Sequence, residues 1–320
     1  MTRYVLRRLA QMLPVFLLAS LALFLALNLL PGDPARRLLG NRASPEQVAV
    51  VRDRLGLDEP VMTRYASWLA GVVRGDLGAS FGSATPVREM VARALPVTLL
   101  LASAALVVAL VLAIPAALVS VTRPGGLVDG LLTVVSVVST SVPTFVWGLS
   151  FILVFALALR VLPSSGYVSP VADPLGAARS LALPVLAMAL PSVGVMARVA
   201  RAAMLETMQE PAMQFARAKG LSPSRLLLVH ALKPASVAVV SVAGVEFAYL
   251  LGDTVVVEWV FSLPGLGKLL IDSFLQREYF VIQGVAVVFT IAVLFSSLAT
   301  DLVNASIDPR LQERLVGGAG

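Results

Sequence analysis

The sequence predicts an all-α, polytopic membrane protein with six transmembrane helices and a small helical insert outside the membrane. Its 320 residues are 58% hydrophobic and only 14% charged, and the mean hydropathy is +0.88. A soluble domain of this length would need far more polar surface. The apolar residues also form long runs, and a helix needs about 20 such residues to cross the hydrocarbon core. Six runs reach spanning length, at residues 9–30, 96–119, 131–159, 181–197, 235–257 and 280–300.

The N-terminal segment and the first span are expected over residues 1–30. Arg3, Arg7 and Arg8 precede the apolar run, as in the basic region of a signal peptide. The run is too long for the apolar region of such a peptide, and a Pro-Gly-Asp-Pro turn follows it instead of a small-residue cleavage site. We therefore expect a first span that is retained.

The long segment 31–95 is expected to form a small extracytoplasmic subdomain of helices. Residues 44–46, Ser-Pro-Glu, have the order of an N-cap, a first-turn proline and an acidic residue, and this helix should reach about Leu55. A second helix is expected over residues 61–74. After a glycine-rich stretch, residues 87–93 should begin the second membrane helix.

The core transmembrane domain is expected over residues 96–305, with five spans, and a cytoplasmic tail follows over 306–320. The fourth run is the shortest and holds Pro184 and Pro191. Neighbouring helices can satisfy the backbone groups that proline frees in a membrane, so we expect a kinked span and not a broken one.

The distribution of basic residues predicts that both termini lie in the cytoplasm. With the N-terminus inside, the cytoplasmic segments hold 12 Lys and Arg residues and the short outside loops hold 4. The segment 31–95 was left out of this comparison because long loops are poor guides to topology.

The cytoplasmic connector 206–233 has the pattern of two short helices. Glu210 and Pro211 suit the start of the first helix, and Gly220 suits its end. Ser222 and Pro223 suit the start of the second, which should end near Lys233 and Pro234. A solvated positive loop is the plainer reading, but a tether needs far fewer residues. A helix-turn-helix DNA reader has similar spacing, yet both ends are fixed at the membrane, so no nucleic-acid partner is expected.

Two motifs in this connector resemble a known family. Ala216-Arg-Ala-Lys-Gly220, followed after nine residues by His230-Ala-Leu-Lys233, is similar to the "EAA" loop of binding-protein-dependent ABC importer permeases of the dipeptide/oligopeptide type. The resemblance extends over nearly the whole chain, through residues 28–34, 257–267, 277–279, Asp301 and 308–310. Two positions depart from the family pattern: Pro234 follows the second motif at once, and Asp253 stands where a small residue is common.

The resemblance implies a type I ABC importer permease fold and a non-catalytic subunit of an ATP-driven transporter in the bacterial inner membrane. It implies peptides as substrate, with nickel, glutathione or another small solute as alternatives. The implied partners are a second homologous permease, most simply as a heterodimer, two cytoplasmic ATPase subunits or a fused one, and an extracytoplasmic substrate-binding protein. ATP and Mg would be bound by the ATPase subunits, and this chain would hold no cofactor.

Site residues follow from the same resemblance. The ATPase-coupling residues would be Glu210, Phe215, Ala216, Ala218, Lys219, Gly220 and His230. The glycines of the loop after the fifth span are expected mainly as turn formers, and the loop, with Pro264, Gly265 and Gly267, would help to receive the binding protein.

Acidic residues occur in one of the six apolar runs, the fifth, at Glu246 and Asp253. They are seven residues apart and therefore share a helix face. A carboxylate at this depth is costly unless it is paired, hydrated or protonated, and no span holds a Lys or Arg. Either these acids line a translocation pathway and meet a cationic group of the substrate, or a protonated Glu246 bonds to a neighbouring helix. Another possibility is a secondary transporter that uses them as an ion site, although no inverted repeat is visible.

The sequence predicts neither catalytic residues nor a metal site. There is no Cys, and His230 is the single His. Residues 265–268, Gly-Leu-Gly-Lys, fall short of a phosphate-binding loop, because Ser262 stands at the first glycine position and Leu269 follows the lysine. A membrane-embedded enzyme is disfavoured for the same reasons, and we expect this chain to bind no ATP.

Overall fold

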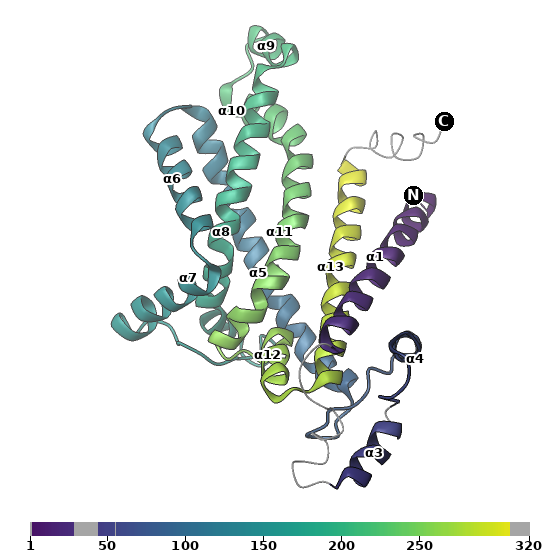
Figure 1. The fold of residues 1–320 in the computed structure, drawn as a ribbon. Helices are drawn as coiled ribbons and strands as arrows, with labels where there is room; N and C mark the ends of the chain where they lie inside the picture. The colour runs from purple at the N-terminus through teal and green to yellow at the C-terminus, as the bar shows by residue number, and fades with distance from the viewer. Residues whose placement is uncertain (1, 29–43, 55, 308–320) are drawn as a thin grey trace.

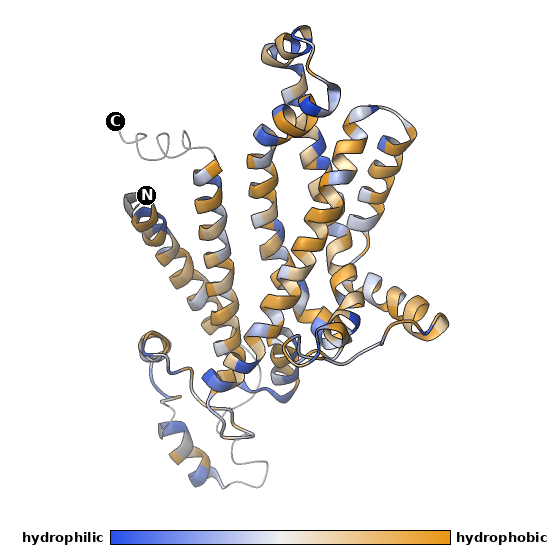
Figure 2. Cartoon of the chain, turned by 180° about the vertical axis from the view of Figure 1, so that it is seen from behind, coloured by the Kyte–Doolittle hydropathy of each residue, from blue (hydrophilic) through white to orange (hydrophobic). Residues whose placement is uncertain are grey.

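Five long helices run side by side in the computed structural model, which describes residues 2–28, 44–54 and 56–307 (Figure 1). All five are long and apolar enough to cross a membrane. Figure 2 shows hydrophobic residues along their lengths and hydrophilic residues gathered toward the two ends of the molecule. These helices correspond to the first, second, fourth, fifth and sixth predicted spans. They are α1 (Thr2–Asn28), α5 (Val87–Thr122), α8 (Pro174–Gln209), α11 (Leu232–Val260) and α13 (Tyr279–Ile307).

The third predicted span, 131–159, is not one straight helix. It consists of α6 (Leu127–Ser141) and α7 (Thr144–Phe151), which continues as the π-helix η1 (Ile152–Ala158), and the axis bends by 101° at the break. Val142 is extended there, with φ −103° and ψ 129°, because the ring of Pro143 disfavours a helical conformation in the preceding residue. The described part of the chain therefore has six spans when this bent pair is counted as one.

Small residues let α5 and α8 approach closely at the centre of the bundle. On α5, Ala102, Ala105 and Ala109 recur at helical spacing and are fully buried. Larger side chains of α8 and α11, such as Met188 and Leu251, fill the space beside them. Small residues at a helix interface are the usual way to gain contact area between helices in a membrane. Pro184 and Pro191 lie inside the continuous helix α8, as expected.

The insert between α1 and α5 contains α3 (Pro45–Arg54) and α4 (Val61–Val73). A reciprocal cap opens α3, because Gln47 N–H donates to Ser44 Oγ and Ser44 N–H donates to Gln47 Oε1. Arg52 donates to Asp58 at 2.6 Å, and this bond holds the pKa of Asp58 below its usual value.

Aromatic rings join α4 to the C-terminal half of α1. The ring of Phe24 lies 5.6 Å from the rings of both Tyr65 and Trp68. Tyr65 also donates its hydroxyl hydrogen to the carbonyl oxygen of Leu17 at 3.2 Å. The insert is thereby fixed to the first span at the end of the molecule opposite to α9 (Figure 1).

The connector forms α9 (Pro211–Ala218), α10 (Pro223–Arg225) and the π-helix η2 (Leu226–Ala231). The prediction that its second helix ends near Lys233 and Pro234 is wrong, since the helix continues directly into α11. A π-helical turn makes this possible. Leu232 N–H bonds to Leu227 O, five residues back, and regular α-helical geometry begins at Leu232 without a break in the helix. Pro234 then falls in the first turn of α11, where proline is tolerated.

Candidate functional site

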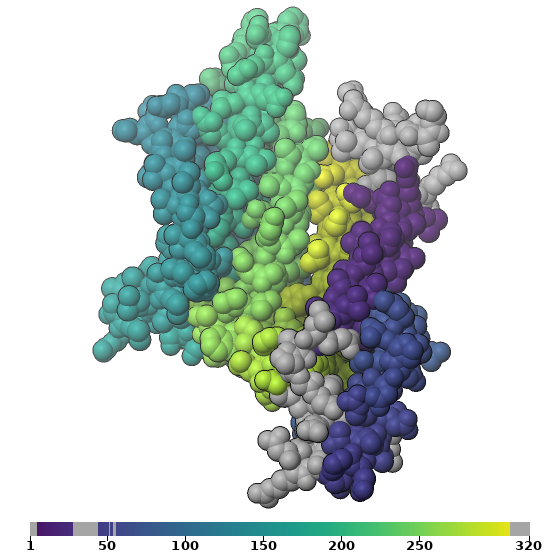
Figure 3. Space-filling view, in the orientation of Figure 1, coloured from purple at the N-terminus to yellow at the C-terminus, as the bar shows by residue number. Residues whose placement is uncertain are grey.

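The helix α9 projects beyond the ends of the long helices (Figure 3). Glu210 stands before it in an extended conformation, and Pro211 is its first residue. On the inner side, Met213 is buried and belongs to an apolar cluster with Val121 of α5, Met204 of α8 and Leu226 of η2. Met213 therefore anchors α9 in an apolar cluster to which α5, α8 and η2 also contribute.

The outer side of α9 carries an aromatic ring and a cation. Phe215 is 63% exposed, and Lys219 Nζ lies 4.5 Å from the centre of its ring. Such a cation–π pair holds both side chains in one place on the surface. Gly220 ends the segment with φ +80°, a conformation that L side chains rarely adopt. The outer side is thus a small, ordered and basic surface suited to a protein partner.

The predicted coupling residues are not all on one element. Glu210, Phe215, Ala216, Ala218, Lys219 and Gly220 lie on α9 or at its ends, and all are at least partly exposed. His230 lies on η2 and is exposed. The structure places His230 next to the start of α11 and not on α9.

A polar cluster beneath the connector was missed in the sequence. Arg201 of α8 donates to Asp129 Oδ2 of α6 at 2.6 Å and to Ser120 Oγ of α5 at 2.9 Å. Gly125 N–H, in the turn between α5 and α6, donates to the same Asp129 oxygen at 2.8 Å. The cluster ties this turn to α8. The sequence signal for this cluster is one acid, Asp129, in the turn between the second and third predicted spans.

Glu246 lies inside the bundle. It is 9% exposed, and Ser192 of α8 donates to its Oε2 at 2.6 Å. This is the arrangement expected if Glu246 bonds to a neighbouring helix.

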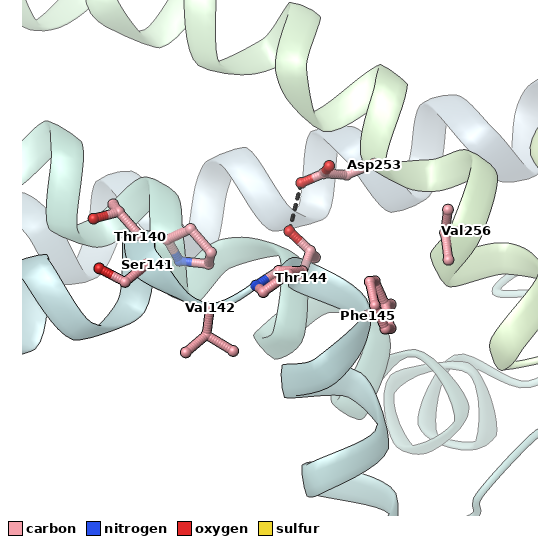
Figure 4. Close-up of a pocket in the computed structure, with 9 residues that line it drawn as sticks. Thr140, Ser141, Val142, Thr144, Phe145, Asp253 and Val256 are labelled. Carbon is pink, nitrogen blue, oxygen red and sulfur yellow. Dashed lines mark hydrogen bonds between the residues drawn. The ribbon is translucent and has the colours of Figure 1, made fainter.

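Asp253 lies at the α6–α7 break, beside a pocket of about 340 Å³. Thr144, the first residue of α7, donates to Oδ2 of Asp253 on α11 at 2.7 Å, and Figure 4 shows this bond between the two helices. The structure therefore separates the two intramembrane acids: Glu246 faces α8, and Asp253 faces a pocket.

The loop after α11 is shaped by a buried carboxylate. Glu258 is fully buried, and it accepts hydrogen bonds from Thr98 Oγ1 at 2.7 Å and from Gly267 N–H at 2.7 Å. It thereby caps the start of α12 (Leu266–Gln276). A side chain at Gly265 would overlap Glu258, since its Cβ would lie 2.3 Å from Glu258 Cδ.

Of the predicted docking residues in this loop, only Pro264 is exposed. Gly265 and Gly267 are buried, and a Cβ at Gly267 would lie 2.4 Å from Val255 Cα. Their role in the fold is close approach of the backbone to α11. Contact with an external protein at this loop would fall to Pro264 and to the exposed residues of α12.

A second carboxylate fixes the corner between α12 and α13. Glu278 accepts hydrogen bonds from Phe81 N–H and Gly82 N–H, both at 2.6 Å. The rings of Phe81 and Phe280 pack beside it with centres 5.1 Å apart. Residues nearly 200 positions apart are joined in this way, which no local pattern in the sequence indicates.

Two family profiles match this chain. The profile for the binding-protein-dependent transport system inner membrane component matches residues 106–313, and the N-terminal profile for the membrane component of such systems matches residues 1–102.

Two known proteins are similar to this chain over nearly its full length. A probable peptide ABC transporter permease protein of Sinorhizobium fredii is 36% identical over 309 residues, which is 97% of this chain and 99% of the relative. A glutathione transport system permease protein of Escherichia coli is 35% identical over 312 residues, which is 98% of this chain and 99% of the relative.

The fold is also similar to a solved structure. A chain of the methionine ABC transporter MetNI, in an inward-facing conformation, aligns with a TM-score of 0.55 at 20% sequence identity. The alignment covers 68% of this chain and 96% of the MetNI chain.

Proposed function

Because the chain belongs to the family of binding-protein-dependent transport system inner membrane components, we propose that it forms half of the path by which an ATP-driven importer takes up peptides. Membership makes it a multi-pass permease of an ABC importer. The observation that carries the mechanism is α9, which projects from the bundle and is fixed on α5, α8 and η2 through Met213.

The proposed role of α9 is to pass movement of an ATPase into the spans. An ATPase that grips Phe215 and Lys219 would displace α9, and the buried Met213 couples that displacement to Met204 and Leu226. The continuous helix from Pro223 to Val260 would carry the movement to the far side of the membrane. Two ATPase subunits, a second and different permease, and an external binding protein are the proposed partners.

The proposed orientation places both termini in the cytoplasm. The start of α1, the end of α13 and α9 lie at one end of the molecule (Figure 1). The insert with α3 and α4, together with α12, lies at the other end. This grouping agrees with the excess of basic residues in the predicted cytoplasmic segments.

Peptides are proposed as substrate from the relatives. One relative is named a peptide permease and another a glutathione permease, at 36% and 35% identity. Glutathione is itself a small peptide, so both names indicate the same class of solute. Uptake of nickel or of a different small solute is the alternative that the uptake assay below decides.

The test is uptake by proteoliposomes that contain the assembled transporter. We expect Lys219→Glu or Gly220→Pro to leave ATP hydrolysis in place while ATP-driven peptide uptake falls at least about tenfold, because the contact that transmits movement is lost. Arg179→Glu, exposed near the start of α8 at the opposite end of the molecule, is the matched control and should change uptake little. Unchanged uptake per ATP in both connector variants would refute the coupling role. Uptake that needs no ATP would favour a secondary transporter.

A further inference from the structure

The pocket at the α6–α7 break is formed by residues of four helices. Its volume of about 340 Å³ lies within the range of small-molecule sites. Asp253 is seven residues from the end of α11, so the pocket lies about 10 Å along the helix from that end. Next to Asp253, a Cβ added at Gly252 would meet no atom within 4 Å, which shows that the backbone is open there. The lining residues are Thr140, Ser141, Val142, Pro143, Thr144, Phe145, Pro191, Asp253 and Val256.

The charge of this pocket is negative. Of the described residues that line it, Asp253 alone is charged. The described ion pairs all involve other acids, so no Lys or Arg in that part of the chain neutralises Asp253. Thr144 bonds to Oδ2, and Oδ1 has no hydrogen-bond partner among the described residues. One carboxylate oxygen thus remains available to a ligand.

The helix break adds to the negative potential. The last carbonyl groups of a helix have no partner within it and carry a partial negative charge. Here α6 ends at Ser141, and Thr140 and Ser141 line the pocket. Trp147 Nε1–H donates a hydrogen bond to the carbonyl oxygen of Ser139 at 3.2 Å. The hydroxyl groups of Thr140 and Ser141 donate back into α6 and point away from Asp253 (Figure 4), so the end of α6 contributes through its backbone dipole.

We propose that Asp253, in the negative potential of the C-terminal end of α6, binds a protonated primary amine, namely the N-terminal ammonium group of a peptide in transit. This inference rests on the proposed function for the identity of the amine. An ammonium group donates hydrogen bonds and accepts none, so it matches the available Asp253 Oδ1, and the helix end favours its positive charge. Broken helices whose free ends meet the substrate are a known way to build such a site within a membrane.

The two intramembrane acids then have different tasks. Glu246 accepts a hydrogen bond from Ser192 inside the helix bundle, whereas Asp253 presents one carboxylate oxygen to the pocket. Pro191, next to Ser192, lines the same pocket. The proposed preference for a positive charge therefore comes from Asp253 alone, and not from Glu246 and Asp253 together.

A labelling experiment tests the charge preference without any transport. The chain has no Cys, so Ser141→Cys supplies a single thiol in the pocket. In membrane vesicles with the partner subunits, we compare its reaction rates with the cationic reagent 2-aminoethyl methanethiosulfonate and the anionic reagent 2-sulfonatoethyl methanethiosulfonate. Adding Asp253→Asn should lower the cation-to-anion rate ratio at least about tenfold, because a unit charge in the lining of the same pocket is removed.

Two matched variants separate charge from structure. Thr144→Val removes the hydrogen bond to Asp253 but keeps the charge, so the ratio should stay high. A thiol at Gln276→Cys, exposed on α12, should show no effect of Asp253→Asn. A ratio at Ser141→Cys that does not respond to Asp253→Asn, or that Thr144→Val lowers equally, overturns the proposal.

Protection and uptake identify the amine. Alanyl-alanine should slow labelling of Ser141→Cys, whereas its N-acetylated form should not, and equal protection by both overturns the assignment to the ammonium group. Peptide uptake by the transporter with the natural chain tests the proposed function separately. Uptake without an Asp253 effect on labelling refutes this inference alone. An Asp253 effect without peptide uptake supports a cation site and refutes the peptide function.

Discussion

Two of the buried carboxylates, Glu258 and Glu278, accept backbone N–H groups. Glu258 accepts from Gly267 and Glu278 accepts from Phe81 and Gly82, and neither acid forms an ion pair among the described residues. Two turns at the end of the molecule that holds α12 are therefore held by carboxyl groups that have no basic side chain as partner among the described residues.

Replacement of Glu258 tests this at a single site. Glu258→Leu leaves the Gly267 and Lys268 N–H groups and the Thr98 hydroxyl without their acceptor, at about 1–3 kcal/mol for each buried unpaired group. We expect the melting temperature of the detergent-solubilised protein to fall by several degrees. Glu258→Gln retains an acceptor oxygen and should lose less. Equal losses for the two variants would contradict the capping role.

The partners of individual acids could not be predicted from the sequence. The presence of Glu246 and Asp253 in the fifth span was visible, and so was the need for a partner. Which helix faces each acid depends on packing between segments more than 50 residues apart, as the bonds to Ser192 and Thr144 show. The sequence indicates Gly265 and Gly267 as turn formers in a loop that helps docking, and only the fold shows that both are buried.

At the scale of elements, hydrophobicity and length predicted five continuous spans but not the break in the third. Prolines occur inside α5 at positions 96 and 115 and inside α8 at 184 and 191, and these helices continue. At Pro143 the chain turns by 101°. Ser139, Thr140 and Ser141 come just before it, and their hydroxyl groups bond to carbonyl groups of α6. Packing around a proline decides whether a helix kinks or breaks there, and these packing contacts cannot be predicted from a single sequence.

The contact between α8 and the α5–α6 turn can be tested with a double-mutant cycle. Asp129→Asn leaves Arg201 without its ion partner, and Arg201→Gln leaves Asp129 in the same state. Breaking one side of a partly buried pair costs more than removing both. We expect Asp129→Asn/Arg201→Gln to lower the melting temperature by less than the sum of the single changes. Additive losses would mean that the two side chains do not interact.

The whole molecule has two differently built ends. At one end α9 stands out from the bundle on apolar contacts, and at the other the carboxylates of Glu258 and Glu278 fix α12 and the neighbouring turn. The proposed function requires such a division, because one end would meet a moving ATPase and the other would receive a binding protein. The long helices α8 and α11 join the two ends, so movement at α9 can reach the pocket at Asp253.

The central claim is that α9 is the contact with the ATPase, and site-specific photo-crosslinking tests it most directly. Phe215 on α9 and Phe274 on α12 are exposed to 63% and 55%, so benzoylphenylalanine at each position gives a matched pair at opposite ends. In vesicles with the assembled transporter, position 215 should crosslink to the ATPase subunit and position 274 should not. A crosslink to the ATPase from position 274, with none from 215, would contradict both the coupling role and the orientation.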